Sequence, residues 1–589
     1  MDENVAENAT DKVDATTMKK DDEKLDDDRV HIKNIPPFLG FKQFKKTLEK
    51  ILKEIKPKKL RHMKDYAYVT FETPDEAQQA IEAVNGYEIK KFVLSAELAA
   101  TEVKDFRVRT DDRKFDNPKT TKEVVTPLSE VPYENQLEIK TQQSIKTVEK
   151  LYRQLRDVKI QNIGKIAEFK QKLQNIIPAP KICGYRNKCE FTIGNNMNGE
   201  ITVGFVGGRF SKNQHYVIPL ENVDIISKQM YAIVQDVQDL VKNSDLEPFN
   251  EFERKGFWRM LTIREFGGDV MLIFTVFPAE NENDKNAEDE IKTRIASRYL
   301  NNSTFIEKKF RVVSVYWQQM IHCSDPIKYE LIGGAPYIYE SLLNCRFRVS
   351  PSAFFQTNSR TASVLYRKIG EFCELAENVD NPTENTEHLK IPPVAEGESE
   401  EVEPKRIKLD GGESEEKPFD YGTVLLDICC GTGTIGQCVL KSLGNSKKIC
   451  CVGIEMISEA VEDAKQNSKQ NKLDGICKYI AGKAEDVFRS MKYHLPVGFD
   501  LRKSRVVGVL DPPRAGMHEK VILACREMET MKRLIFVSCD PNAAMKNIVD
   551  LCRPTSNKFV GVAFTVTKIQ PVDMFPMTNH FEWIIQLDR

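Results

Sequence analysis

The pattern of apolar and polar positions over residues 29–100 predicts a small β-α-β-β-α-β domain, a ferredoxin-like α+β fold. Alternating apolar residues indicate strands, and apolar residues three and four apart indicate helices. We expect strands over residues 30–35, 66–71 and 92–97, and helices over 41–55 and 75–84. Residues 1–28 are acidic and polar and are expected to be disordered, and residues 101–135 read as a proline-containing linker.

Residues 136–349 predict a helical lead-in followed by a mixed α/β central domain, which we expect to bind RNA. Helical spacing over residues 143–177 indicates one or two long helices, and a further helix is expected near 228–242. Six stretches read as strands: KCEFTIG, EITVGFVG, MLTIREF, VMLIFTVF, VVSVYWQ and CRFRVS. Cys183 and Cys189 lack the further ligands of a zinc or iron–sulfur site, so we expect no metal here.

Residues 350–589 alternate buried strands with helices and predict a doubly wound, Rossmann-like sheet of seven strands. The acidic, proline-containing stretch 376–418 interrupts this domain and is expected to be a disordered insertion. The expected strands cover residues 423–427, 448–455, 477–481, 505–510, 533–537, 560–569 and 581–587.

Composition and charge say more about where in the cell the protein is found than about which reaction it catalyses. The net charge of -2 conceals acid-rich segments over residues 1–28 and 396–416 and a basic segment over 41–64. The 14 cysteines include adjacent pairs in apolar runs, which is typical of reduced, buried thiols. No membrane span, secretory leader or mitochondrial leader is expected. We expect the protein in the nucleus and the cytoplasm. The basic cluster PKRIKLD, from Pro404 to Asp410, is expected to bind an import receptor.

Two stretches in the N-terminal domain resemble the signatures of an RNA-recognition motif: VHIKNI and KDYAYVTF, which begins at Lys64. Strand alternation places His31, Tyr66 and Tyr68 on one face, where unstacked bases can stack on exposed rings. We expect these three residues and Lys64 to bind RNA. Two departures are His31, where an aromatic ring is usual, and Asp65, where glycine is usual. The alternative is a motif that binds protein or is covered by the rest of the chain.

The first strand of the C-terminal domain runs into DICCGTGTIG, a glycine-rich turn that contains Gly431, Gly433 and Thr434. A GxGxxG string alone is a weak signal. Glu455, at the end of the next strand, can accept hydrogen bonds from both ribose hydroxyls of a nucleoside. Asp486 follows the third strand, near the place of an adenine amino group. These residues fit a nucleoside cofactor and leave S-adenosylmethionine and NAD both open.

The next strands end in residues that can react. Residues 505–510 run into DPPR, with Asp511 and Arg514, and residues 533–537 run into SCDP, with Cys539. If the last strand is antiparallel to the others, its beginning, where Glu582 stands, lies at the same edge of the sheet. A cytosolic cysteine is usually a small buried hydrophobe. A thiol and a carboxylate that converge on a nucleoside site favour a reactive Cys539.

Four stretches, SPSAFFQTN, DPPR, FVSCDP and DMFPMTNHFE, resemble in sequence and in order the motifs of the RNA uracil-5-methyltransferases that use S-adenosylmethionine. The resemblance covers about residues 181–589, and the RNA-recognition motif makes the chain most similar to the eukaryotic tRNA branch. It implies that Gln356, the Gly431 loop, Glu455 and Asp511 bind the cofactor. It also implies that Cys539 is the nucleophile and Glu582 the base. Two departures are SCDP in place of SCNP, and no iron–sulfur cysteine set, which argues against the bacterial rRNA branch.

The implied activity is methylation of carbon 5 of a uridine in tRNA, at position 54 of the T-loop, giving 5-methyluridine. Addition of the Cys539 thiolate to carbon 6 makes carbon 5 nucleophilic, and Glu582 then removes the carbon 5 proton. Arg514 is a candidate to stabilise the enolate oxygen, or else pairs with Asp511 or a phosphate. The uridine has to flip out of its stack.

Three alternatives remain at this point. The chain could bind RNA or help tRNA fold with little catalysis, or it could make 5-methyluridine in rRNA or mRNA. A Rossmann-type dehydrogenase is the third, but it leaves DPPR and the terminal Glu582 unexplained. The oligomeric state and the role of the acidic insertion do not follow from the sequence.

Overall fold

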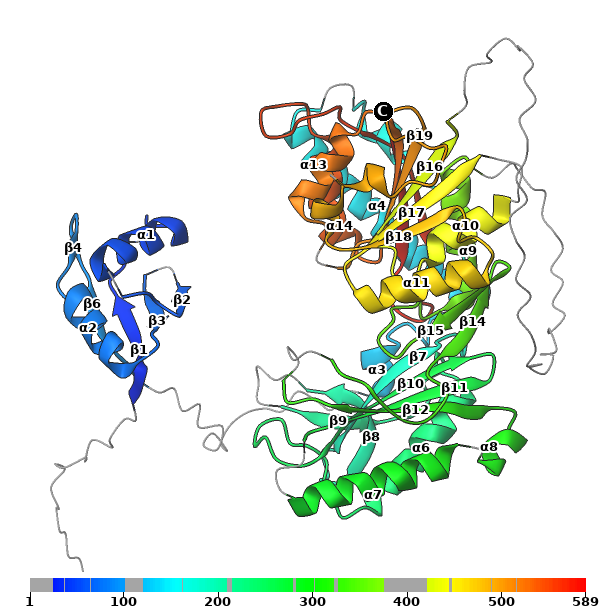
Figure 1. Ribbon diagram of the computed structural model, residues 1–589, viewed down its shortest axis with the longest axis horizontal. Coiled ribbons are helices and arrows are strands. Elements are labelled where there is room, and N and C mark those ends of the chain that lie inside the picture. The colour runs from blue at the N-terminus through cyan, green and yellow to red at the C-terminus, as the bar shows by residue number, and fades with distance from the viewer. Residues whose placement is uncertain are drawn as a thin grey trace, which may run out of the picture. The chain divides into compact units, whose positions relative to one another are not determined.

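The computed structural model describes residues 25–36, 38–53, 55–63, 65–100, 120–160, 163–208, 214–278, 282–300, 302–322, 327–375, 421–443, 448–488, 490–514 and 516–589 (Figure 1). Contacts divide the chain into two units, Met1–Lys114 and Phe115–Arg589. Lys64, most of the acidic tail, the insertion 376–418 and the basic cluster from Pro404 to Asp410 lie outside the described residues. No helix among the described residues is long and apolar enough to cross a membrane.

The first unit is an antiparallel sheet with the strand order β2-β3-β1-β6, packed against two helices, so the expected β-α-β-β-α-β order is confirmed. Its core contains apolar residues from the sheet and from both helices, among them Val30, Phe44, Val69 and Ala77. The elements are β1 (Leu25–Lys33), α1 (Phe41–Leu52), β2 (Lys59–His62), β3 (Ala67–Thr70), α2 (Pro74–Val84), β4 (Glu88–Ile89), β5 (Phe92–Val93) and β6 (Ser95–Ala100).

Two boundaries in this unit correct the sequence analysis. Strand β1 begins at Leu25, inside the stretch 1–28 that was expected to be disordered, and its pairing with β6 shifts register between Leu25 and Val30. The stretch 92–97 is not one strand. β5 pairs with β4 in a hairpin, and the N–H of Leu94 turns back to donate to the carbonyl of Tyr87 before β6 begins.

The central domain is built on a seven-stranded sheet with the order β13-β12-β11-β10-β7-β8-β9. The helices α6 (Lys228–Lys242) and α7 (Glu282–Tyr299) cover one face of this sheet (Figure 1). The six expected strands and the helix over 228–242 are confirmed, whereas β9, β13, β14, α7 and the short α8 (Ser303–Glu307) were not predicted. The strands are β7 (Lys188–Asn195), β8 (Ile201–Gly207), β9 (Tyr216–Pro219), β10 (Trp258–Phe266), β11 (Asp269–Val276), β12 (Arg311–Gln319), β13 (Glu330–Gly334), and the hairpin β14 (Ile338–Leu342) and β15 (Cys345–Val349).

The segment before the central sheet differs from the expected linker and lead-in. α3 (Thr121–Val125) and the start of α4 (Tyr133–Asp157) lie within the stretch 101–135, so the expectation of a linker is wrong there. α4 is followed by the short α5 (Ile166–Lys170). Val148 and Leu151 of α4 share a core with Trp583 of the last strand, so α4 packs on the C-terminal domain.

The C-terminal domain is the expected doubly wound sheet, with the order β18-β17-β16-β19-β20-β22-β21. The strands are β16 (Thr423–Ile428), β17 (Ile449–Glu455), β18 (Cys477–Ala481), β19 (Arg505–Leu510), β20 (Met531–Ser538), β21 (Thr565–Val572) and β22 (Glu582–Asp588). Neighbouring strands from β18 to β20 are parallel, and β22 is antiparallel to both β20 and β21. Only β21 is displaced from its expected range of 560–569.

Helices cover both faces of this sheet and bury a separate core on each (Figure 1). One face carries α9 (Ser359–Phe372), α10 (Thr434–Leu443) and α11 (Ser458–Gln470). The other carries α4, α13 (Glu519–Glu527) and α14 (Pro541–Cys552), while the short α12 (Ala484–Val487) follows β18. Because β16 to β20 are parallel, their carboxyl ends lie at one edge of the sheet, which is the usual place of a ligand site in such sheets.

Candidate active site

Cys539 lies between a buried strand and the start of a helix. β20 ends at Ser538, and Asp540 caps α14 by accepting hydrogen bonds from the N–H groups of Asn542 and Ala543 at 3.0 and 3.2 Å. The Cys539 side chain is half-buried. A thiol at a helix N-terminus is in a position that favours the thiolate. The aspartate of SCDP thus has a local structural role, as the N-cap of α14.

Glu582 reaches the same edge through the antiparallel pairing of the last strand. Ser538 pairs with Trp583 in the register of β20 and β22, so the beginning of β22 adjoins the end of β20. This confirms the expected direction of the last strand. Glu582 is 3% exposed, and its Oε2 has no hydrogen-bond partner in the described part of the chain. Burial, with a further contribution from the charge of Asp511, raises the pKa of the Glu582 carboxyl.

Arg514 adjoins the thiol. Burial raises the pKa of Cys539, and the charge of Glu582 adds to the rise. A hydrogen bond from the Arg514 guanidinium and its positive charge oppose the rise. Among the described residues no ion pair joins Arg514 to Asp511, one of the alternatives for this arginine. The sequence analysis did not consider that Arg514 could act on the thiol.

The glycine-rich turn after β16 and the end of β17 are joined through Glu455. Its Oε2 accepts a hydrogen bond from the N–H of Gly431 at 3.1 Å, and its Oε1 accepts from the N–H groups of Met456 and Ile457 at 2.8 and 3.0 Å. Gly433 has a φ of 76°, and a Cβ there would lie 2.7 Å from the Tyr479 hydroxyl. Glycine at this position is required both by backbone conformation and by space.

Asp427 is a site residue to which the sequence analysis gave no role. Its side chain is fully buried at the end of β16, and its Oδ2 accepts a hydrogen bond from the N–H of Gly436 at 2.9 Å. Its Oδ1 has no partner among the described residues. Burial, with the charges of Asp511 and Glu455, raises the pKa of Asp427 to about 7. The available signal was an aspartate ending a buried strand directly before the glycine turn.

These residues fit a cationic nucleoside cofactor. Asp427, Glu455 and Asp511 end neighbouring strands and supply carboxyl groups at one edge, and burial raises the pKa of Asp511 as well. Met456 and Ile457, directly after Glu455, are exposed apolar side chains on which a flat base can lie. A positive charge placed here would stabilise the carboxylate forms.

The remaining predicted cofactor residues lie around this edge. Thr434 begins α10, and its hydroxyl lies 3.3 Å from the hydroxyl of Tyr366 in α9. Gln356 is buried in the loop that precedes α9. Asp486 is exposed in the first turn of α12, which follows β18. Their contacts with a cofactor stay predictions.

The loop that leads to Glu582 is held by buried contacts with α4. The ammonium group of Lys140 lies 2.5 Å from a carboxylate oxygen of Asp573, and both side chains are fully buried. Lys140 also donates to the carbonyl of Phe575 at 2.9 Å, and Gln136 accepts from the N–H of Met577 at 2.8 Å. The indole N–H of Trp583 donates to Ser144. None of these positioning residues was predicted.

In the first unit, His31, Tyr66 and Tyr68 form a contiguous ring cluster on the sheet. The His31 and Tyr68 rings stack at 4.6 Å, and Tyr66 lies edge-on to both rings at 5.4 and 5.8 Å. Ala67 and Val69 are buried on the opposite side, which confirms the predicted alternation. Lys64 lies outside the described residues.

Comparisons with known proteins agree with this architecture. A family model for the RNA recognition motif matches residues 30–95, and one for a methyltransferase domain matches residues 419–583. The chain is 30% identical over 577 residues to tRNA (uracil-5-)-methyltransferase homolog A of Mus musculus, covering 95% of this chain and 84% of that protein. It is 30% identical over 480 residues to homolog B of Homo sapiens, covering 79% and 83%.

Among solved structures, the chain is similar to the Pyrococcus abyssi tRNA (uracil-54, C5)-methyltransferase in complex with S-adenosyl-L-homocysteine. The TM-score is 0.48 and the identity 20%, and the match covers 85% of this chain and 91% of that one. The fold and the site define a methyltransferase that carries an RNA recognition motif. Within that class, the chain belongs to the tRNA (uracil-5-)-methyltransferase family, which confirms the resemblance seen in its motifs.

Proposed function

We propose that this enzyme uses S-adenosylmethionine to methylate carbon 5 of a uridine in tRNA. The observation that carries the proposal is the antiparallel pairing of β20 with β22, which brings Cys539 and Glu582 to one edge of the sheet. The names of the relatives support tRNA as the substrate, and uridine 54 of the T-loop is the expected position.

In the proposed mechanism Cys539 acts first, and Arg514 supports it. The Sγ thiolate adds to carbon 6 of the uracil and forms an enolate, which makes carbon 5 nucleophilic. Arg514 favours this step because its positive charge stabilises the thiolate. S-adenosylmethionine, held by the predicted cofactor residues Gly431, Glu455 and Asp511, would supply the methyl group for carbon 5 as a sulfonium.

Glu582 completes the reaction. After methylation carbon 5 carries a proton, and a Glu582 oxygen accepts it while the bond between Sγ and carbon 6 breaks. A raised pKa makes the Glu582 carboxylate a stronger base than an exposed glutamate. The thiolate is regenerated, and the product is 5-methyluridine.

Nucleoside mass spectrometry tests the reaction. Unmodified tRNA transcript incubated with the enzyme and S-adenosylmethionine should gain 5-methyluridine, and a transcript with cytidine at position 54 should gain none. Methylation of the second transcript would contradict the position, and no methylated uridine in either would contradict the reaction.

We also propose that the chain enters the nucleus through the cluster from Pro404 to Asp410, whose residues Lys405, Arg406 and Lys408 carry positive charge. A fluorescent fusion of the full chain should be found in both compartments. Changing these three residues to alanine should leave it in the cytoplasm alone, and an unchanged distribution would contradict the proposal.

A further inference from the structure

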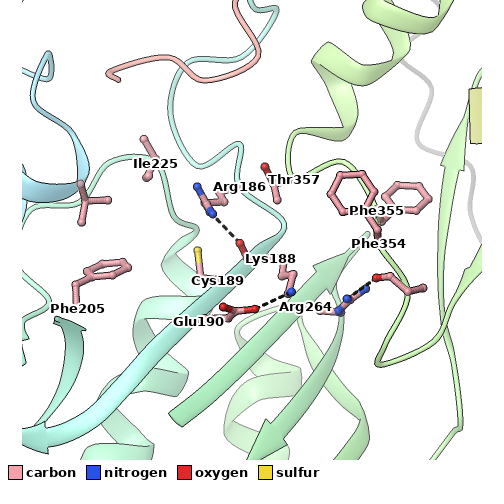
Figure 2. A pocket seen from close by; sticks show the side chains of 12 residues that line it. Arg186, Lys188, Cys189, Glu190, Phe205, Ile225, Arg264, Phe354, Phe355 and Thr357 are labelled. Atoms are coloured by element: carbon pink, nitrogen blue, oxygen red, sulfur yellow. Dashed lines mark hydrogen bonds and ion pairs between the residues drawn. The ribbon is translucent and has the colours of Figure 1, made fainter. Parts of the chain in front are cut away.

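A cavity of about 370 Å³ lies beside the site, between the central sheet and the loop that carries Gln356 (Figure 2). Its walls come from β7, β10, α3 and the residues on either side of Gln356. The lining residues on which the argument depends are Val125, Arg186, Lys188, Glu190, Phe205, Arg264 and Phe354. Phe354 and its neighbours belong to the stretch SPSAFFQTN, but the reaction proposed above gives this cavity no role.

The cavity has an unusual concentration of positive charge. Lys188 on β7 stands directly opposite Arg264 on β10. Like charges in this relation destabilise a sheet unless something compensates them. Glu190 compensates Lys188, with the ammonium group 2.7 Å from its carboxylate (Figure 2). Arg186 and Arg264 form no ion pair with a carboxylate among the described residues, so the cavity keeps an excess of cations.

One buried N–H group of Arg264 lacks a hydrogen-bond acceptor among the described residues. It is 2% exposed, and one terminal nitrogen donates to the carbonyl of Ala353 at 2.5 Å (Figure 2). Its Nε–H is buried and has no partner among the described residues. Buried donors almost always have an acceptor, because leaving one unpaired is costly. Burial lowers the pKa of Arg264 to about 10, so the guanidinium still carries its charge at neutral pH.

The other walls fit a flat ring. Phe354 is 66% exposed, which is unusual for a phenylalanine, and Phe205 faces the cavity from β8 (Figure 2). Exposed rings beside cations are the arrangement that binds single-stranded nucleic acid, where bases stack and phosphates pair. A volume of about 370 Å³ lies within the range of small-ligand sites.

We propose that this cavity binds one nucleotide of the substrate RNA, other than the methylated uridine, through its phosphate at Arg186 and Arg264 and its base beside Phe354. This inference rests on the proposed function. The loop shared with Gln356 places this nucleotide next to the cofactor site, so RNA bound here also positions the chain that enters the active site.

Two variants and one control test the proposal in the full chain. Arg186→Gln removes one cation, and its side chain is only half-buried. Val125→Trp fills the cavity from α3 and removes no charge. Arg294→Gln is the control, because Arg294 is exposed on α7, on the face of the central sheet covered by helices. Thermal melting shows that each variant is folded.

Binding of unmodified tRNA transcript is measured at several salt concentrations. Arg186→Gln should weaken binding about three- to tenfold and lower the slope of log affinity against log salt by about 0.7–0.9, because one phosphate contact is lost. Val125→Trp should weaken binding with a smaller change of slope, and the control should match wild type. S-adenosylmethionine affinity without RNA should stay the same in all three.

The outcomes separate this inference from the proposed function. If both cavity variants bind tRNA as wild type does, with the same salt slope, the cavity is not an RNA site. If the cavity variants weaken tRNA binding as predicted but the wild-type enzyme makes no 5-methyluridine, the proposed reaction is wrong and the cavity remains an RNA site.

Discussion

At the scale of single residues, the proposed mechanism gives Cys539 and Glu582 two different roles. The Cys539 thiol has to lose its proton before it reacts, and the Glu582 carboxyl has to be free to accept one afterwards. Burial raises the pKa of both groups; the charge of Glu582 adds to the rise at the thiol, and the charge of Asp511 adds to the rise at Glu582. Arg514 opposes this effect at the thiol. Substitutions of Cys539, Glu582 and Arg514 should therefore have different effects on the enzyme in solution.

Glu582→Gln should stop the reaction after the covalent step. The amide cannot take the carbon 5 proton, so the bond between Cys539 and carbon 6 cannot break. We expect an RNA–protein adduct that survives denaturing gels, and loss of 5-methyluridine by at least about a hundredfold. Cys539→Ala should give neither adduct nor product. An adduct between Cys539→Ala and RNA that contains 5-fluorouridine would show that another residue is the nucleophile.

Arg514→Gln should shift the titration of the thiol. Removing a positive charge that favours the thiolate raises the pKa of Cys539, so less thiolate is present at a given pH below that pKa. Alkylation of Cys539 by iodoacetamide at neutral pH should slow about three- to tenfold, and its pH profile should move to higher pH. Peptide mass spectrometry gives the rate, with the exposed Cys183 of the same molecules as the internal control. An unchanged profile would contradict the contact.

The residues proposed to carry out the reaction could be selected from the sequence, because they end strands and stand in motifs. Asp427 was visible in the same way but received no role. Lys140 and Arg264 could not be placed, since their partners, Asp573 and Ala353, are far away in the chain. Lys140 did give a weak signal: it falls on the α4 stripe that continues through Ser144 and Val148, where a cation is out of place.

At the scale of elements, α4 serves the active site although it comes from a distant part of the sequence. It holds the loop between β21 and β22 through Lys140 and Gln136, and this loop determines where Glu582 begins the last strand. The sequence analysis missed α7 and β13 because neither has a strong apolar pattern. Half of the residues of α7 are charged and its apolar stripe of Ile291, Ile295 and Tyr299 is narrow, while β13 contains two glycines.

Lys140→Met should destabilise the enzyme strongly, because it leaves the Asp573 carboxylate buried without its cation. Breaking a buried pair typically costs about 3–5 kcal/mol, whereas replacing both partners costs less. The double variant Lys140→Met with Asp573→Leu should therefore recover part of the free energy of unfolding, measured by urea titration. Lys146→Met, exposed on the same helix, should change it by less than about 0.5 kcal/mol.

A purely structural role and a positioning role can be told apart in the same double variant. If the Lys140 contacts position Glu582, the folded double variant should show a lower kcat and an RNA adduct that accumulates, as in Glu582→Gln. A folded double variant with normal kcat and no adduct would limit these contacts to stability.

At the scale of the whole molecule, the chain joins a unit with a half-buried ring cluster to a unit that holds the proposed reacting groups. The proposed reaction uses only residues of the second unit, Phe115–Arg589, since both proposed reacting groups and the predicted cofactor residues lie there. The first unit should therefore contribute affinity for RNA and not the chemistry.

Replacing Tyr66 and Tyr68 with alanine tests this division in the full chain. Stacking of a base on an aromatic ring contributes about 1–3 kcal/mol, so losing these rings should weaken tRNA binding by at least about fivefold. KM for tRNA should rise by a similar factor while kcat at saturating tRNA stays within about twofold, because the rings touch no reacting atom. Tyr87→Ala is the matched control, since Tyr87 is exposed on the same unit just before β4. A fall in kcat with unchanged KM would mean that the first unit acts on the reaction itself, and unchanged binding would mean that the ring cluster serves a partner other than tRNA.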